Sequence, residues 1–149
     1  MPIRCEIVSQ DRLVFEGDVD ILVAPGTEGE MGILPHHAPL LTTLKHGVLK
    51  VRHQGREDLF AVSGGVMEVR PDIITVLADA AEHSDEIDLA RAEEARQRAE
   101  ESLRAVPPPG SEAYLAAEAA LRRSNLRLQV GRRRRASGLG FEGGGPGSS

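Results

Sequence analysis

The sequence Met67-Glu68-Val69-Arg70-Pro71-Asp72-Ile73-Ile74-Thr75-Val76-Leu77-Ala78, residues 67–78, predicts two short strands joined by a tight turn. Apolar side chains predominate on both sides of the turn, as they do in strands of a sheet, and Pro71 presets a backbone angle that turns use. Similar runs precede this hairpin at intervals of about 8–12 residues, with no helical pattern between them. They occupy residues 3–8, 19–23, 48–51 and 59–62. The pattern predicts that residues 1–84 form an antiparallel β-sandwich or flattened barrel.

The spacing of the apolar residues changes after Ser84, from that of strands to that of helices. Residues that favour helices predominate there, and small or apolar residues recur every three or four positions, at Ala92, Ala95, Ala99 and Leu103. The turn Pro107-Pro108-Pro109-Gly110 must end this first helix, because prolines remove backbone donors. A second helix is expected over about residues 111–130, with Ser111 as its N-cap. We therefore predict a helical hairpin at residues 85–130, held weakly because burying an alanine methyl contributes only about 0.8 kcal/mol.

Charge is distributed unevenly along the 149 residues, whose net charge is −5. Residues 119–149 carry seven arginines and one acidic residue, whereas the rest of the chain is acidic. Gly131 is expected to end the second helix, and residues 131–149 read as a disordered Arg/Gly-rich tail with nothing to bury. This asymmetry indicates an anionic partner for the basic end of the chain.

Composition excludes several protein classes. No apolar run approaches the roughly 20 residues of a membrane helix, and the charged N-terminal residues do not fit a signal peptide. The single cysteine, Cys5, cannot form an internal disulfide, and its place in an alternating run predicts a small, half-buried apolar role. We expect an intracellular, soluble protein without a multi-cysteine metal site.

The glycine-rich segment 24–41 is the most distinctive part of the sequence. A phosphate-binding loop would need a nearby cation, but this segment carries Glu28 and Glu30 and has no lysine. The adjacent His36 and His37 diverge in an extended segment and lack a third ligand, so metal binding is not expected. The residues by themselves favour a long turn whose glycines adopt positive φ.

Taken together, four motifs resemble the epsilon subunit family of bacterial F-type ATP synthases, called delta in mitochondria. They are Gly29-Glu30-Met31-Gly32-Ile33-Leu34-Pro35-x-His37-Ala38-Pro39-Leu40, Ser63-Gly64-Gly65-Val66-Met67-Glu68-Val69, Thr75-Val76-Leu77-Ala78-Asp79 and Ile87-Asp88-x-x-Arg91-Ala92. Their order and spacing match the family over residues 1 to about 130, and the resemblance implies the same β-sandwich and helical hairpin. The Pro-Pro-Pro-Gly turn and the Arg/Gly-rich tail depart from the family pattern.

The resemblance implies a non-catalytic rotor subunit of the central stalk, which contacts the gamma subunit and the membrane ring of c subunits. Its hairpin would extend into the alpha/beta catalytic head and inhibit ATP hydrolysis. The subunit would be peripheral, at the cytoplasmic face of the cell membrane, and attached only through the proton-transporting complex. No cofactor is required, although ATP is a regulatory ligand in some members. The alternative is a purely structural coupling subunit without nucleotide binding or inhibition.

The resemblance places the contact with the c-ring on Glu30, Met31 and His37. The apolar side chains of Met31, Ile33 and Leu34 in an otherwise polar loop suit a partner surface. A solvated turn without a partner is the other interpretation.

A regulatory ATP site is implied by the resemblance at Glu82, Ile87, Asp88, Arg91, Ala92, Arg123 and Arg127. If the two helices pack antiparallel about a turn near residues 107–110, opposed positions sum to about 217, so Arg91 faces roughly position 126, between Arg123 and Arg127. Three guanidinium groups around one groove would repel one another unless an anion such as triphosphate lies between them. The alternative is purely structural: Ser84 or Asp85 caps the helix, and Asp88 pairs with Arg91 three residues later.

Two other functional classes are not favoured. The chain has five histidines and many carboxylates, but no nucleophile elbow, metal-ligand spacing or cofactor fingerprint accompanies them, so we expect no catalytic site. The cluster Arg132–Arg135 lacks interleaved aromatic residues, so it reads as a solvated segment and no nucleic-acid partner is expected.

Overall fold

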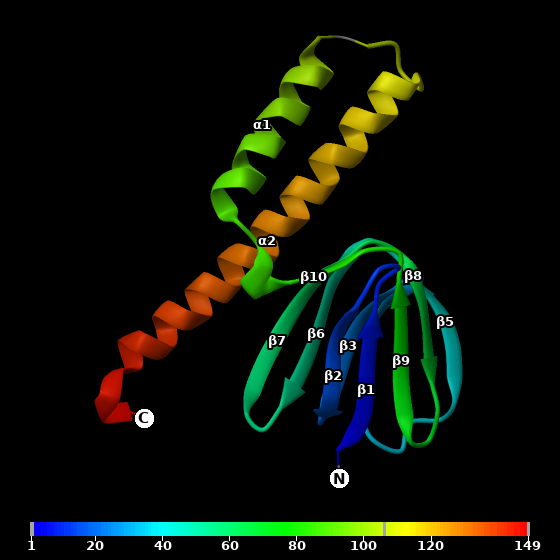
Figure 1. Cartoon of the computed structure of the whole chain (residues 1–149), viewed down its shortest axis with the longest axis vertical. Helices are drawn as coiled ribbons and strands as arrows, with labels where there is room; N and C mark the ends of the chain where they lie inside the picture. Colours follow the sequence, from blue (N-terminus) through cyan, green and yellow to red (C-terminus); the bar gives the residue numbers. More distant parts are fainter. Residues whose placement is uncertain (1, 106, 149) are drawn as a thin grey trace. The chain divides into compact units, whose positions relative to one another are not determined.

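The computed structural model describes the backbone of residues 2–105 and 107–148, and the side chains of those residues up to 133. The chain divides into two compact units, Met1–Ser84 and Asp85–Ser149. The first unit holds ten strands (Figure 1), which are β1 (Ile3–Val8), β2 (Leu13–Val19), β3 (Ile21–Gly26), β4 (Gly29–Ile33), β5 (Leu40–Leu44), β6 (Gly47–His53), β7 (Arg56–Val62), β8 (Gly65–Val69), β9 (Ile73–Ala78) and β10 (Ala81–His83). A short 3₁₀ turn, Ser84–Glu86, follows β10, and the second unit holds α1 (Leu89–Arg104) and α2 (Glu112–Ser148).

The strands hydrogen-bond in the order β10-β7-β6-β3-β5-β8-β9-β1-β2, with β4 paired to β3. All these pairings are antiparallel except that of β1 with β9, which is parallel. The strands curve around one core, as Figure 1 shows, and the predicted β-sandwich followed by two helices is confirmed.

Alternation along the strands decides which side chains enter the core. In β1, Ile3, Cys5 and Ile7 are buried, and in β9 Ile74, Val76 and Ala78 are buried. The hairpin predicted at 67–78 forms, with Met67 opposite Val76. Cys5 is fully rather than half buried. Burial raises the pKa of its thiol to about 12, so at neutral pH Cys5 is an apolar core residue.

Gly65 has a specific reason to be glycine. Its φ is +128°, a conformation that side chains rarely adopt, and an added Cβ would lie 2.3 Å from the backbone oxygen of Leu77. Only a residue without a Cβ allows β8 to begin against β9 at this distance.

Residues 24–41, expected as a long turn, contain a further strand. β4 pairs with β3 through five residue pairs that end with Gly29 opposite Gly26. The turn interpretation was therefore wrong for Gly29–Ile33. Gly29, with φ +135°, allows the chain to reverse within two residues, so that β4 can return along β3.

The start of α1 also differs from the expectation. Asp88, not Ser84 or Asp85, is the N-cap, because its side chain accepts a hydrogen bond from the backbone N–H of Arg91. Ser84–Glu86 form the 3₁₀ turn that precedes this cap. Ser111 caps α2 as predicted, since its Oγ accepts from the backbone N–H of Tyr114 at 3.2 Å.

Gly131 does not end α2, because the helix continues through it to Ser148. Gly131 is instead a point of close approach: an added Cβ would lie 2.5 Å from Cδ2 of Leu89. The prediction of a helix end at this glycine was wrong because glycine serves tight packing as well as helix termination. We predicted a disordered tail at residues 131–149. The side chains of this segment from residue 134 onward lie outside the described part of the structure. Within the described residues, no helix is long and apolar enough to cross a membrane.

Candidate functional site

A row of apolar side chains crosses the outer face of the sheet formed by β8, β9, β1 and β2. Val66 is directly opposite Leu77, and Leu77 is opposite Val8. Val8 is in turn opposite Leu13. Leu77 and Leu13 are 50% and 52% exposed, and Val66 is 37% exposed. We call Val66, Leu77, Val8 and Leu13 the apolar row; contiguous exposed apolar surface of this kind marks an interaction site.

Sequence reasoning did not find the apolar row, because its members are far apart along the chain. A signal was present: Val66, Leu77 and Val8 stand where the alternation of their strands calls for polar residues. Leu41 on β5 lies on the same face and is 72% exposed, two residues from Thr43, the partner of Val66. The strand register is what joins these positions into one surface.

The three residues proposed to contact the c-ring lie in and after β4. Glu30 is exposed and opposite Pro25, whereas the side chain of Met31 packs partly against the core. His37 lies in the following turn, where its Nδ1 is 2.7 Å from the carbonyl oxygen of Ala38. Leu34 is 57% exposed, more than its apolar neighbours Met31 and Ile33. The contact itself stays a prediction.

Three polar side chains, Asp58, His53 and His83, form a hydrogen-bonded cluster beside the core residue Phe60. Asp58 on β7 accepts hydrogen bonds from Nε2 of His53 at 2.7 Å and Nε2 of His83 at 2.8 Å. Phe60 packs edge-on against His83, with ring centroids 4.9 Å apart. Burial alone would raise the pKa of Asp58, but the hydrogen bonds from the two imidazoles outweigh it and hold the pKa below its ordinary value. Within residues 2–105 and 107–133, no His, Cys, Asp and Glu side chains are grouped so as to hold a metal ion.

Asp88 and Arg91, both assigned to ATP by the resemblance, are engaged with each other. Oδ1 of Asp88 accepts from the backbone N–H of Arg91 at 3.1 Å, and Oδ2 lies 3.8 Å from Nε of the same residue. The side chain of Arg91 is 83% exposed. The capping and ion-pair alternative therefore describes the observed contacts of these two residues.

A groove of about 710 Å³ lies between α1 and α2 toward the turn that joins them. Two arginines line it, Arg98 from α1 and Arg123 from α2. The remaining lining is small or apolar: Ala95, Ala99, Ser102, Ala105, Pro107, Ala113, Ala116, Ala117 and Ala120. The groove combines an apolar wall with two guanidinium groups, which suits an anion that carries an apolar part.

Of the two arginines that line the groove, Arg123 was expected and Arg98 was not. Arg98 takes the place predicted for Arg91, which is not among the described residues that line the groove. The way the two helices face each other is close to the expected one, since Ile87 and Leu89 both lie against Gly131, within about three residues of the expected sum of 217. Arg91 nevertheless does not line the groove, and its exposed side chain pairs with Asp88.

The other residues of the implied ATP set are dispersed over several elements. Glu82 is on β10 opposite Ala61, and Ile87 precedes α1 and lies near Gly131. Ala92 is fully buried in α1, and Arg127 is half-buried in α2, one turn beyond Arg123. Their joint participation in one site stays a prediction.

Two family models match this chain. Residues 2–84 match the β-sandwich domain of the ATP synthase delta/epsilon chain, and residues 85–131 match the long α-helix domain of the same chain. Among curated relatives, the ATP synthase epsilon chain of Dehalococcoides mccartyi is 53% identical over 135 residues, covering 89% of this chain and 94% of the relative. That of Herpetosiphon aurantiacus is 49% identical over 135 residues, covering 91% and 98%.

Solved structures share the fold. A chain of the Euglena gracilis mitochondrial ATP synthase assembly with OSCP, F1 and c-ring superposes with a TM-score of 0.63 at 22% identity, covering 91% of this chain and 81% of that one. A chain of the central stalk and c-ring of the Tetrahymena thermophila enzyme gives a TM-score of 0.58 at 15% identity, with coverages of 88% and 97%. The sequence matches over both units carry the conclusion: the chain belongs to the ATP synthase delta/epsilon chain family, whose members are non-catalytic subunits of the ATP synthase.

Proposed function

We propose that this chain is the rotor subunit that joins gamma to the c-ring in the central stalk of an F-type ATP synthase. The observation that carries the proposal is the apolar row, because a β-sandwich that exposes Leu13, Val66 and Leu77 on one face needs a partner to cover them. The gamma subunit is that partner in our proposal, and the β4 segment with Glu30, Met31 and His37 contacts the c-ring. The subunit is then peripheral, held at the cytoplasmic face of the membrane by the proton-transporting complex.

The helical hairpin is the regulatory part in this proposal, inhibiting ATP hydrolysis when it extends into the alpha/beta head. Toward the turn its helices face each other largely through alanines, of which Ala99 and Ala117 are buried, whereas the larger buried side chains of α2 are Leu126, Leu128 and Val130. Each alanine methyl contributes about 0.8 kcal/mol, against roughly 1.5–3 kcal/mol for a buried leucine. The groove between the helices leaves part of their facing surface unfilled, which further supports a hairpin that separates at low cost.

ATP is the proposed regulatory ligand of the closed hairpin. Arg98 and Arg123 line one groove, and their like charges favour an anion between them. The set implied by the resemblance adds Glu82, Ile87, Asp88, Arg91, Ala92 and Arg127. Arg91 must leave its contact with Asp88 to join this set, so that part of the binding energy offsets the lost helix-cap interactions.

A second candidate function is structural coupling alone, without inhibition or nucleotide binding. The contacts of Asp88 and Arg91 favour it, since capping of α1 accounts for both residues. Membrane vesicles that carry the ATP synthase with residues 88–149 of this chain deleted separate the candidates. Inhibition by the hairpin predicts retained ATP synthesis and increased ATP hydrolysis, whereas structural coupling alone predicts that both rates stay unchanged. Loss of synthesis in the truncated complex would contradict the assignment of coupling to the first unit.

A further inference from the structure

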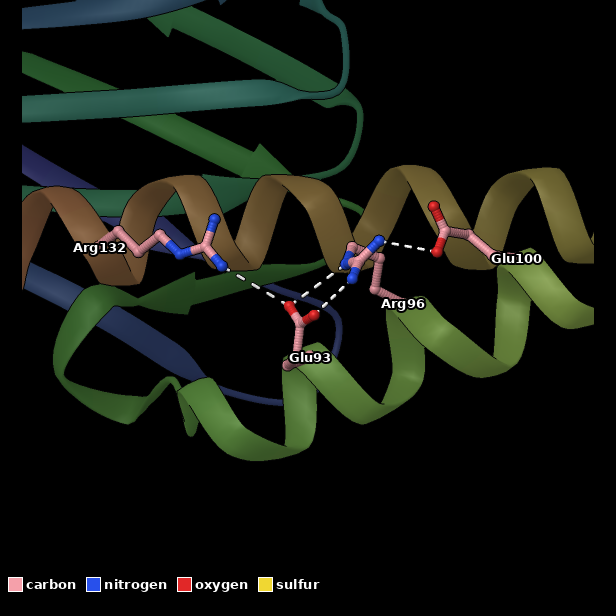
Figure 2. A network of polar contacts seen from close by, with 4 residues as sticks. All are labelled: Glu93, Arg96, Glu100 and Arg132. Atoms are coloured by element: carbon pink, nitrogen blue, oxygen red, sulfur yellow. Dashed lines mark hydrogen bonds and ion pairs between the residues drawn. The ribbon is translucent and has the colours of Figure 1, made fainter.

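Four charged side chains form a network on one side of the helical hairpin (Figure 2). Within α1, Arg96 donates to Glu93 through Nε at 3.2 Å and also through Nη2, and it donates to Glu100 through Nη1 at 2.8 Å. Arg132 on α2 approaches the same Glu93, with Nη2 3.6 Å from Oε2. The pair of Glu93 with Arg132 therefore links the two helices, and the pairs of Arg96 lie within α1.

Arg96 fixes the direction of the Glu93 carboxylate. Its planar guanidinium bonds both oxygens of Glu93, while Glu100 holds it from the other side. The hydrogen bond from Arg96, with smaller contributions from Arg132 and Gln97, lowers the pKa of Glu93, so this carboxylate is charged at neutral pH. Arg132 thus meets an anion whose rotamer is already set, which reduces the entropy that the ion pair costs.

The packing beside this network is close. Leu89 and Ile87 lie against Gly131, the residue before Arg132, so tightly that an added Cβ would meet their side chains at 2.5 and 3.2 Å. Toward the turn, by contrast, an alanine-lined groove lies between the helices. The pair of Glu93 with Arg132 therefore lies at a well-packed end of the hairpin.

We propose that Glu93 and Arg132 form a charge clasp that holds the hairpin closed, with Arg96 as its positioning residue. The proposal rests on the proposed function of the hairpin as a movable regulatory element. Opening the hairpin breaks the pair of Glu93 with Arg132 but leaves Arg96 bound to Glu93 and Glu100 within α1. Salt therefore weakens the attraction between Glu93 and Arg132, the pair that links the two helices, and the closed state is favoured at low salt.

Amide hydrogen exchange in the full-length chain tests the clasp, because it reports rare opening as a change in protection. The readout is the protection of the amides of Ser124 to Leu128 on α2, none of which is itself substituted. At about 0.05 M salt, Glu93→Gln is expected to lower this protection about two- to fivefold, the range for a partly exposed ion pair. Arg132→Gln should have the same effect, and the double variant should lose no more than either single one.

The chain offers matched controls next to each residue. Glu94→Gln and Arg133→Gln remove the same charges from exposed positions one residue away and should leave the protection of α2 unchanged. At about 1 M salt, where the screening length falls to about 3 Å, the effects of Glu93→Gln and Arg132→Gln should nearly vanish. Additive losses in the double variant, or equal losses in the two controls, overturn the clasp.

The positioning role of Arg96 is tested separately, by measuring the coupling between Glu93 and Arg132 without Arg96. In an Arg96→Gln background, the coupling between Glu93 and Arg132 should fall toward zero, although Arg96 contacts only α1 residues. Coupling that persists or grows would show that Arg96 competes with Arg132 for Glu93, which contradicts positioning.

Failure of the clasp is distinguishable from failure of the proposed function. The exchange experiment uses the isolated chain and contains no catalytic head. In the assembled complex, the Arg132→Gln variant should open the hairpin more often and lower ATP hydrolysis further. An exchange effect without a change in hydrolysis contradicts inhibition by the hairpin and supports the clasp, whereas the absence of an exchange effect contradicts the clasp.

Discussion

Oδ1 of Asp88 accepts a hydrogen bond from the backbone N–H of Arg91 at 3.1 Å, and this bond begins α1. Asp88 and Arg91, which the family resemblance assigns to ATP, are thus also the residues that start α1. If ATP recruits Arg91 as proposed, it acts on the same turn that Asp88 stabilises. The proposal therefore predicts that ATP binding and capping of α1 are coupled.

The capping role of Asp88 predicts a specific pattern of stability. Asp88→Ala should lower the stability of the helical unit by about 0.5–2 kcal/mol, because a backbone donor in the first turn loses its acceptor. Asp88→Ser should retain most of the stability, since serine is also a good N-cap. Thermal unfolding followed by circular dichroism at 222 nm measures both. Equal melting temperatures for the alanine variant and the unmodified chain would contradict the cap.

The groove predicts which arginines matter for ATP. Removing one guanidinium from a phosphate site costs about 1.5–3 kcal/mol, so Arg98→Ala and Arg123→Ala should each weaken ATP binding roughly ten- to a hundredfold. Arg104→Ala removes an exposed arginine of α1 that does not line the groove and should change the affinity little. Titration calorimetry of the isolated chain measures all three. No heat at millimolar ATP, or an equal loss in the Arg104 variant, would contradict the site.

Asp58 predicts a pH dependence of the first unit. Its pKa is lower in the folded chain than the ordinary value of 3.8, so folding favours the charged form. The stabilisation is fully present above about pH 4–5 and is lost as the pH falls through the folded-state pKa. Asp58→Asn should therefore reduce the urea midpoint at pH 7, and the difference from the unmodified chain should shrink below pH 4. A difference that stays constant from pH 7 to pH 2.5 would contradict the role of the carboxylate.

Comparison of Gly65 with Gly55 separates the effect of a steric clash from that of a positive φ angle. Both have positive φ, but an added Cβ at Gly65 meets the backbone of Leu77 and Ala78, whereas nothing lies within 4 Å of one at Gly55. Gly65→Ala should destabilise the chain by at least about 2 kcal/mol, combining strain with a clash. Gly55→Asn should be tolerated, because asparagine accepts the left-handed conformation of this hairpin turn. Similar unfolding midpoints for the two variants would contradict this account.

Local patterns in the sequence predicted the local structure well. The hairpin at 67–78 and the cap at Ser111 depend on neighbouring residues, and both are observed. The parallel pairing of β1 with β9 joins segments about 70 residues apart. No local pattern specifies such a partner, because many strands of similar composition compete for it.

The candidate site was harder to predict than the fold. The apolar row needs the register of four strands before Leu13 and Leu77 become members of one surface. The presence of Arg98 and Arg123 on one groove depends on how the two helices face each other across the hairpin. Both depend on contacts between distant residues, whereas the motif pointed to Arg91, which does not line the groove. The role of Arg91 in ATP binding stays a prediction.

Binding of the gamma subunit to variants of the apolar row tests the proposed function most directly. Leu77→Asp places a charge in the centre of the row and should weaken gamma binding at least about tenfold, because an unpaired charge in a covered apolar surface costs more than about 1.4 kcal/mol. Leu115→Asp is the matched control, since Leu115 is a comparably exposed leucine (53%) on α2, in the other unit. An affinity of Leu77→Asp for gamma equal to that of the control would contradict docking of gamma on this face.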